Sequence, residues 1–132
     1  LVEIYEKYNC SVIAIEEVPG DNISSYGVIS GREIEDGLFE VDDMVEKPKP
    51  EDAPSQLGII GRYVLTPDIF EYIEKTAPGA NGEVQITDAI RTLAKEKRVL
   101  ALKFKGHRFD CGSIDGFVEA TNYYYQRDHA KK

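Results

Sequence analysis

Short apolar segments alternate with helical patterns along most of the chain, and this alternation constrains the fold more than any single residue. Residues 11–15, 57–65 and 99–104 are mainly apolar and short, as buried strands are. Thr66-Pro67 and Thr87-Asp88 each place a hydroxyl where a helix can begin. Strands that alternate with helices predict an α/β layered domain, in which residues 57–65 form a strand covered on both faces.

The remaining segments complete this pattern. Residues 26–29 and the apolar positions of residues 38–45 indicate two more strands, and Ser113 can cap a last helix. Residues 1–8 have the pattern of the last turns of a helix whose beginning is missing. The 132 residues fit one domain or part of a larger one, and we interpret them as a fragment.

Composition excludes several classes of function. The formal net charge is -8 and the cations are dispersed, which argues against general binding to nucleic acid or to an anionic membrane. No apolar stretch approaches the ~20 residues that span a bilayer. Cys10 and Cys111 are too few for a zinc ribbon or a disulfide framework, and they favour a reducing, cytoplasmic location. Cys111 is expected to be a small buried packing residue.

The tripeptide Glu46-Lys47-Pro48 is the first candidate for chemistry, and it is expected where a strand ends. A carboxylate accepts hydrogen bonds from sugar hydroxyls and an ammonium neutralises a phosphate, so the pair suits a phosphorylated sugar. On an extended segment their side chains point to opposite faces, which argues against an ion pair between them. A plain surface strand end is the alternative interpretation.

Four further residues could contribute to such a site. Gly27 and Gly61 interrupt apolar strands, where glycine marks either the close approach of a ligand or a β-bulge. Arg62 could face a phosphate or make a structural pair. Asp110 is expected at a strand end, where a carboxylate either suits Mg²⁺ or accepts hydrogen bonds from the next turn. Thr87 is most simply a helix cap.

Five motifs, in this order, resemble the bacterial UTP–glucose-1-phosphate uridylyltransferases (UDP-glucose pyrophosphorylases). They are Tyr26-Gly27-Val28, Val45-Glu46-Lys47-Pro48, the segment 60–70 that begins Ile60-Gly61-Arg62-Tyr63, the segment 82–90 that begins Gly82-Glu83-Val84-Gln85, and Asp110-Cys111-Gly112. The resemblance implies a layered Rossmann-like nucleotidyltransferase fold with a mixed sheet. It identifies residues 1–132 with the C-terminal, sugar-phosphate-binding part of that domain.

The resemblance also implies residue roles in the transfer of a uridylyl group from UTP to glucose 1-phosphate, which gives UDP-glucose and pyrophosphate. Lys47 would be catalytic and hold the sugar phosphate, Glu46 would bind the ring hydroxyls, and Gly27, Gly61 and Arg62 would line the substrate. Asp110 would face Mg²⁺. The enzyme would be cytoplasmic and a homo-oligomer in its full-length form, and it would supply UDP-glucose for polysaccharide synthesis.

One large departure from the family limits this reading. The glycine-rich triphosphate loop, the base-reading residues and a first metal aspartate have no counterpart in the chain. We therefore expect the chain alone to be inactive. A thymidylyl- or cytidylyltransferase, or a sugar-phosphate-binding module without catalysis, remain the alternatives.

Overall fold

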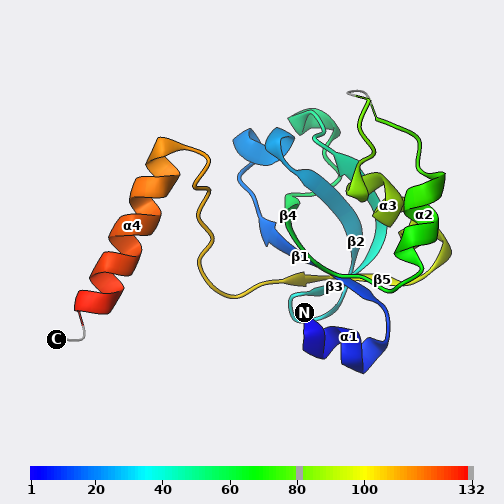
Figure 1. Cartoon of the computed structure of the whole chain (residues 1–132), viewed down its shortest axis with the longest axis horizontal. Helices are drawn as coiled ribbons and strands as arrows, with labels where there is room; N and C mark the ends of the chain where they lie inside the picture. Colours follow the sequence, from blue (N-terminus) through cyan, green and yellow to red (C-terminus); the bar gives the residue numbers. More distant parts are fainter. Residues whose placement is uncertain (80–81, 131–132) are drawn as a thin grey trace.

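A computed structural model describes residues 1–79 and 82–130 of the chain. Five strands form one sheet, and helices precede, interrupt and follow it (Figure 1). In chain order the elements are α1 (Val2–Tyr8), β1 (Ser11–Glu17), η1 (Gly20–Ser25), β2 (Gly27–Glu35), β3 (Leu38–Glu46), η2 (Pro50–Asp52), β4 (Leu57–Val64), α2 (Ile69–Lys75), α3 (Ile86–Glu96), β5 (Val99–Lys103) and α4 (Ile114–His129).

The sheet curves until its two ends meet, in the order β1-β4-β2-β3-β5. β5 pairs with β1 in parallel, whereas the other neighbours are antiparallel. The expected mixed sheet is therefore confirmed. Its closure into a barrel is an additional finding, because hydrophobic periodicity alone carries no information on which edge strands meet.

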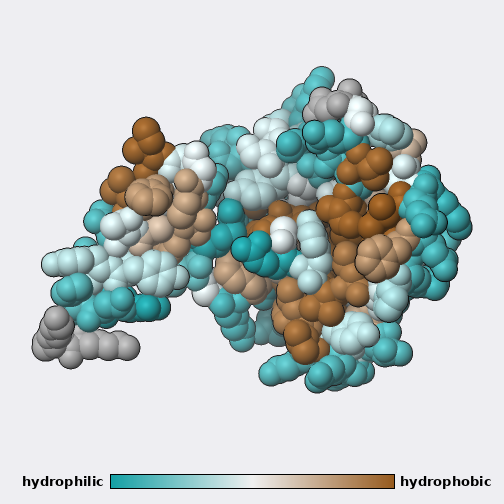
Figure 2. Space-filling model, viewed as in Figure 1, coloured by the Kyte–Doolittle hydropathy of each residue, from teal (hydrophilic) through white to brown (hydrophobic). Residues whose placement is uncertain are grey.

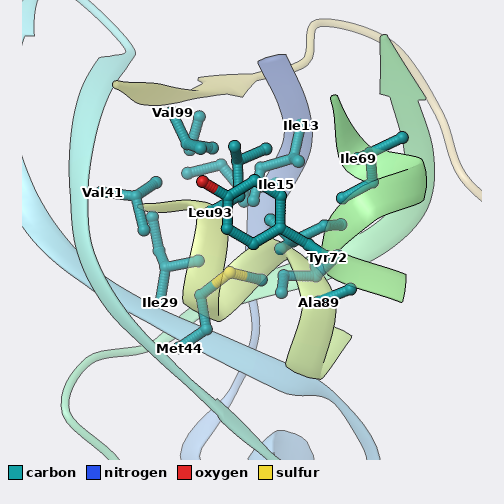
Figure 3. Close-up of a cluster of buried hydrophobic side chains, with 13 residues drawn as sticks. Ile13, Ile15, Ile29, Val41, Met44, Ile69, Tyr72, Ala89, Leu93 and Val99 are labelled. Carbon is teal, nitrogen blue, oxygen red and sulfur yellow. The ribbon is translucent and has the colours of Figure 1, made fainter. Parts of the chain in front are cut away.

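The core lies between the concave face of the sheet and the two helices α2 and α3. Figure 3 shows Ile69 and Tyr72 of α2 and Leu93 of α3 meeting aliphatic side chains of the strands. The apolar spacing of residues 69–73 and 90–94 predicts that these faces point inward, and the structure confirms this. Ile13 and Ile15 of β1 are fully buried there, and each such side chain contributes about 1.5–3 kcal/mol through burial.

Both core helices begin at residues other than those predicted. α2 begins at Ile69, because the Thr66 hydroxyl bonds the Asp68 side chain and Ser11 instead of capping the helix. α3 begins at Ile86, and the carbonyl oxygen of Gln85 accepts from the N–H groups of Asp88 and Ala89. Thr87 is therefore the second residue of the helix rather than its cap.

Two strand predictions also need correction. β2 continues to Glu35, whereas the sequence predicts that its strand ends at Ile29. Gly31 makes the continuation possible, since a Cβ there would lie 2.2 Å from the carbonyl oxygen of Glu40 across the β2–β3 pair. β4 is not covered on both faces, because Gly61 and Arg62 are exposed.

The last helix, α4, projects away from the barrel (Figure 1). Ser113 caps it as predicted, accepting from the backbone N–H of Gly116 at 3.0 Å. Figure 2 shows apolar side chains over its N-terminal half, where Ile114 and Phe117 are exposed. Within residues 1–79 and 82–130, no helix combines the length and apolar character that crossing a bilayer requires.

Candidate functional site

Gly27 and Glu46 are direct partners across the β2–β3 pair, at the end where β2 begins and β3 ends. A Cβ at Gly27 would lie 3.0 Å from Glu46 Oε2, 3.2 Å from Ile59 Cδ1 and 3.6 Å from Thr87 Cγ2. No register shift occurs at Gly27, so the β-bulge interpretation is wrong there. Glycine at this position lets the Glu46 carboxylate and two side chains from β4 and α3 converge on the backbone. We call Gly27, Glu46, Ile59 and Thr87 the Gly27 cluster.

Glu46 is a half-buried carboxylate that has no ion pair or side-chain hydrogen bond with the residues that the structure describes. Its charge and, more strongly, burial raise the pKa of Tyr63 above the ordinary value for a phenol. A carboxylate in this setting has open acceptor sites for a ligand that donates hydrogen bonds.

Lys47 has a left-handed backbone, with φ 46°. Such a conformation is uncommon for a residue with a side chain and is found most often where the surroundings enforce it, including ligand sites. Here the Lys47 N–H donates to the carbonyl oxygen of Tyr26 at 3.0 Å, and the buried Pro48 follows. The left-handed residue interrupts the extended backbone on which the prediction of opposite faces rests. Its exposed ammonium has no ion-pair partner within residues 1–79 and 82–130.

Gly61 and Arg62 form a bulge in β4, opposite β1. The register passes from Ile13↔Tyr63 to Ile15↔Ile59, so β4 has more residues than β1 over the same span. Gly61 has φ 76°, and a Cβ there would meet no atom within 4 Å. The bulge interpretation is therefore correct for Gly61, and the bulge also leaves an open surface between Ile59 and Tyr63. Arg62 donates only to the carbonyl oxygen of Gly61, at 3.2 Å, among its described neighbours.

An ion pair joins the middle of α3 to β3. Arg91 of α3 donates to both carboxylate oxygens of Asp43 on β3, at 2.7 Å and 3.2 Å. That hydrogen-bonded guanidinium holds the pKa of the Asp43 carboxyl below its usual range. Thr87 belongs to the same helix, so the pair helps to fix its position next to Gly27.

Asp110 does not end a strand, contrary to the prediction. β5 ends at Lys103, and Asp110 lies in the loop between β5 and α4. Its Oδ1 accepts from the Gly112 N–H at 3.0 Å, which is the turn that the alternative interpretation describes. The loop is anchored by Arg108, which bonds Glu16 at 2.6 Å and the Tyr26 hydroxyl at 2.5 Å. Asp110 therefore follows two residues after Arg108, which contacts Tyr26, and Tyr26 directly precedes Gly27.

The donor set of Asp110 fits a magnesium ion in part. The exposed carboxylate uses one oxygen in its turn, and its other oxygen makes no hydrogen bond with the described chain. Mg²⁺ commonly takes one or two protein carboxylates together with phosphate oxygens and water. No group of three or more His, Cys, Asp or Glu side chains in the described ranges is arranged to hold a metal ion.

The two cysteines and Tyr123 lie outside the Gly27 cluster. Cys111 is exposed, so its prediction as a buried packing residue is wrong, while Cys10 is buried and both thiols are free. Tyr123 packs against His107 and Phe109 of the loop, with ring centroids 4.4 Å and 5.3 Å away. Tyr123 therefore packs against the loop between β5 and α4.

Sequence reasoning missed Ile59, Thr87 and Arg108 as neighbours of the site. The Thr87 hydroxyl precedes a helical pattern, which is also typical of a helix cap, so the sequence does not distinguish a cap from a site residue. Ile59 and Arg108 come near Gly27 only through pairing between distant segments. No local pattern in the sequence marks such contacts.

Comparisons with known proteins find relatives that match almost the whole chain. A family model described as "Nucleotidyl transferase" matches residues 2–127. A Pseudomonas aeruginosa protein named UTP–glucose-1-phosphate uridylyltransferase is 58% identical over 126 residues, which are 96% of this chain and 45% of the relative. A Streptococcus pneumoniae protein of the same name is 55% identical over 122 residues, 92% of this chain and 41% of the relative.

Solved structures give the same result. A UDP-glucose pyrophosphorylase complexed with UDP-glucose superimposes with a TM-score of 0.90 and 58% identity over 95% of this chain and 48% of that one. A UTP-bound UGPase from Acinetobacter baumannii gives a TM-score of 0.82 at 33% identity, over 96% of this chain and 43% of that one. The chain therefore spans less than half the length of these relatives.

Proposed function

The chain belongs to the nucleotidyl transferase family, and on this premise we propose that it is the sugar-phosphate-binding part of a UTP–glucose-1-phosphate uridylyltransferase. The observation that carries the proposal is the Gly27 cluster with Lys47 beside it. Glu46 is a half-buried carboxylate without a described partner. It is followed directly by Lys47, which has a left-handed backbone and an exposed ammonium. Relatives of that name match almost the whole chain at 58% identity.

Each side chain would then have one task. Glu46 would accept hydrogen bonds from ring hydroxyls of glucose 1-phosphate and so fix the orientation of the ring. Lys47 would neutralise the sugar phosphate, whose oxygen must approach the negatively charged α-phosphate of UTP. Positioning and charge neutralisation are the main requirements of such a transfer, since effective molarities of aligned reactants are very large.

The glycines would shape the surface on which the sugar lies. Gly27 keeps the Glu46 carboxylate against the backbone, and the open bulge at Gly61 leaves room for a ring beside Tyr63. Arg62 is exposed next to that bulge and could reach a phosphate.

Asp110 would hold Mg²⁺ through its free carboxylate oxygen. Bound there, the ion would neutralise phosphate charge as UTP loses pyrophosphate. The triphosphate and the base would be bound by parts of the full-length protein outside this chain, which has no glycine-rich phosphate loop. The location would be cytoplasmic, where thiols such as Cys10 and Cys111 stay reduced. The exposed apolar side chains of α4 leave a surface for the homo-oligomer that we expect.

Release of pyrophosphate by the full-length protein tests this proposal. With UTP, glucose 1-phosphate and Mg²⁺, we expect UDP-glucose and pyrophosphate in equal amounts, and slower turnover with dTTP or CTP. The 132-residue chain alone should give no such turnover. A preference for dTTP or CTP would indicate a thymidylyl- or cytidylyltransferase instead. No turnover with any nucleotide would indicate a sugar-phosphate-binding module without catalysis.

A further inference from the structure

Two polar side chains are buried in the part of the chain that the structure describes, and they differ in how their hydroxyls are satisfied. Ser11 is 1% exposed and Thr87 is 8% exposed. The Ser11 hydroxyl lies 3.1 Å from the Thr66 hydroxyl and accepts from the Thr66 N–H at 2.9 Å. The Thr87 hydroxyl makes no hydrogen bond with a described residue. A hydroxyl without a partner in the described chain can donate to and accept from a ligand, so its partner is worth seeking.

The position of Thr87 indicates what that partner could be. Its methyl group lies 3.6 Å from the point where a Gly27 Cβ would stand, and Glu46 Oε2 lies 3.0 Å from the same point. No fully buried polar side-chain atom in residues 1–79 and 82–130 lacks a partner. The Thr87 hydroxyl must therefore keep some contact with solvent, and the methyl group on the same Cβ lies beside Gly27, as the Glu46 carboxylate does.

The two groups complement each other chemically. A carboxylate can only accept hydrogen bonds, whereas a threonine hydroxyl both donates and accepts. Adjacent hydroxyls of a sugar ring present both donors and acceptors, which a carboxylate alone cannot satisfy. As the second residue of α3, Thr87 also has a backbone N–H without an acceptor within the helix.

We propose that the Thr87 hydroxyl is a specificity-determining contact to a ring hydroxyl of the sugar that Glu46 holds. The inference rests on the proposed function, because it needs the sugar to lie on the Gly27 cluster. A packing role is the competing explanation, since the Thr87 methyl lies beside Gly27. Valine would fill a packing role as well as threonine does, and serine would keep only the hydroxyl.

The experiment compares Thr87→Val and Thr87→Ser in the full-length protein. Thr92→Val is the matched control, because Thr92 is an exposed threonine on the same helix whose hydroxyl donates to the Asp88 carbonyl oxygen. The Michaelis constants for glucose 1-phosphate and for UTP are measured with each variant. They are measured again with 2-deoxy, 3-deoxy and 4-deoxy analogues of the sugar phosphate.

We expect Thr87→Val to raise the KM for glucose 1-phosphate about tenfold, the factor expected for one lost hydrogen bond, with the KM for UTP unchanged. Thr87→Ser and Thr92→Val should stay within about twofold of the parent by the same reasoning. In the parent protein, one deoxy analogue should have a higher KM than glucose 1-phosphate. In Thr87→Val, the KM of that analogue should equal the KM of glucose 1-phosphate.

Other results would overturn the inference. They are an unchanged KM in Thr87→Val, an equal loss in Thr87→Ser, or the same penalty for every deoxy analogue in both proteins. If the parent protein itself does not use glucose 1-phosphate, the proposed function fails, and that outcome is visible before any variant is made.

Discussion

Gly27→Ala should separate the role of Gly27 in the site from its role in the fold. The new Cβ would stand 3.0 Å from Glu46 Oε2 and 3.2 Å from Ile59 Cδ1, closer than ordinary contacts by a few tenths of an ångström. The Glu46 carboxylate ends a flexible side chain, so it can move away. Overpacking costs about 1–3 kcal/mol in a rigid core, and loss of glycine flexibility in the unfolded chain returns about 0.4–1 kcal/mol. The unfolding free energy should therefore fall by only about 1–2 kcal/mol.

The effect on sugar binding should be larger than the effect on stability. A hydrogen bond to a charged group contributes about 1.5–3 kcal/mol, so a displaced Glu46 should raise the KM for glucose 1-phosphate by roughly tenfold or more. The assay pairs urea denaturation with steady-state kinetics of the full-length protein. Gly20→Ala is the control, because a Cβ there meets only Gln56 Nε2, at 3.8 Å. A folded Gly27→Ala protein with an unchanged KM would refute the reasoning.

Three further variants test other parts of the account. Lys47→Ala should lower kcat/KM by about a hundredfold through loss of a charge-assisted contact. The urea midpoint should stay unchanged, since Lys47 has no ion pair with a described residue. An unchanged rate would remove Lys47 from the site. Asp43→Asn should cost ~0.5–1 kcal/mol of unfolding free energy at pH 7. Because Arg91 lowers the pKa of folded Asp43, this difference should persist above the ordinary aspartate pKa of about 3.9 and vanish as pH falls through the lowered value; a difference that grows in acid would contradict the sign. Asp110→Asn should raise the Mg²⁺ concentration for half-maximal rate roughly tenfold or more, and an unchanged Mg²⁺ requirement would place the ion elsewhere.

The sequence predicted the elements of this fold better than their arrangement. All five strands and the inward faces of α2 and α3 follow from periodicity, which is a local property. The closure of the barrel depends on β5 meeting both β1 and β3, and such pairing between distant segments has no local signal. The boundaries shifted where a side chain found a tertiary partner, as the Thr66 hydroxyl did with Ser11.

The sequence offered the residue types of the candidate site but not their arrangement. Glu46 and Lys47 were recognisable because a carboxylate and an ammonium at a strand end suit a sugar phosphate. The sequence predicted either a ligand contact or a β-bulge at both Gly27 and Gly61. Gly61 forms a bulge, whereas Gly27 leaves space in which the side chains of Glu46, Ile59 and Thr87 pack. Only the fold brings those three side chains together.

A crystal structure of the full-length protein with UDP-glucose bound tests most directly whether the Gly27 cluster and Lys47 hold the sugar phosphate. We expect glucose hydroxyls within hydrogen-bond distance of the Glu46 carboxylate and the Thr87 hydroxyl, and the Lys47 ammonium against the phosphate next to the sugar. Glucose bound away from Glu46, with Lys47 facing solvent, would contradict this expectation.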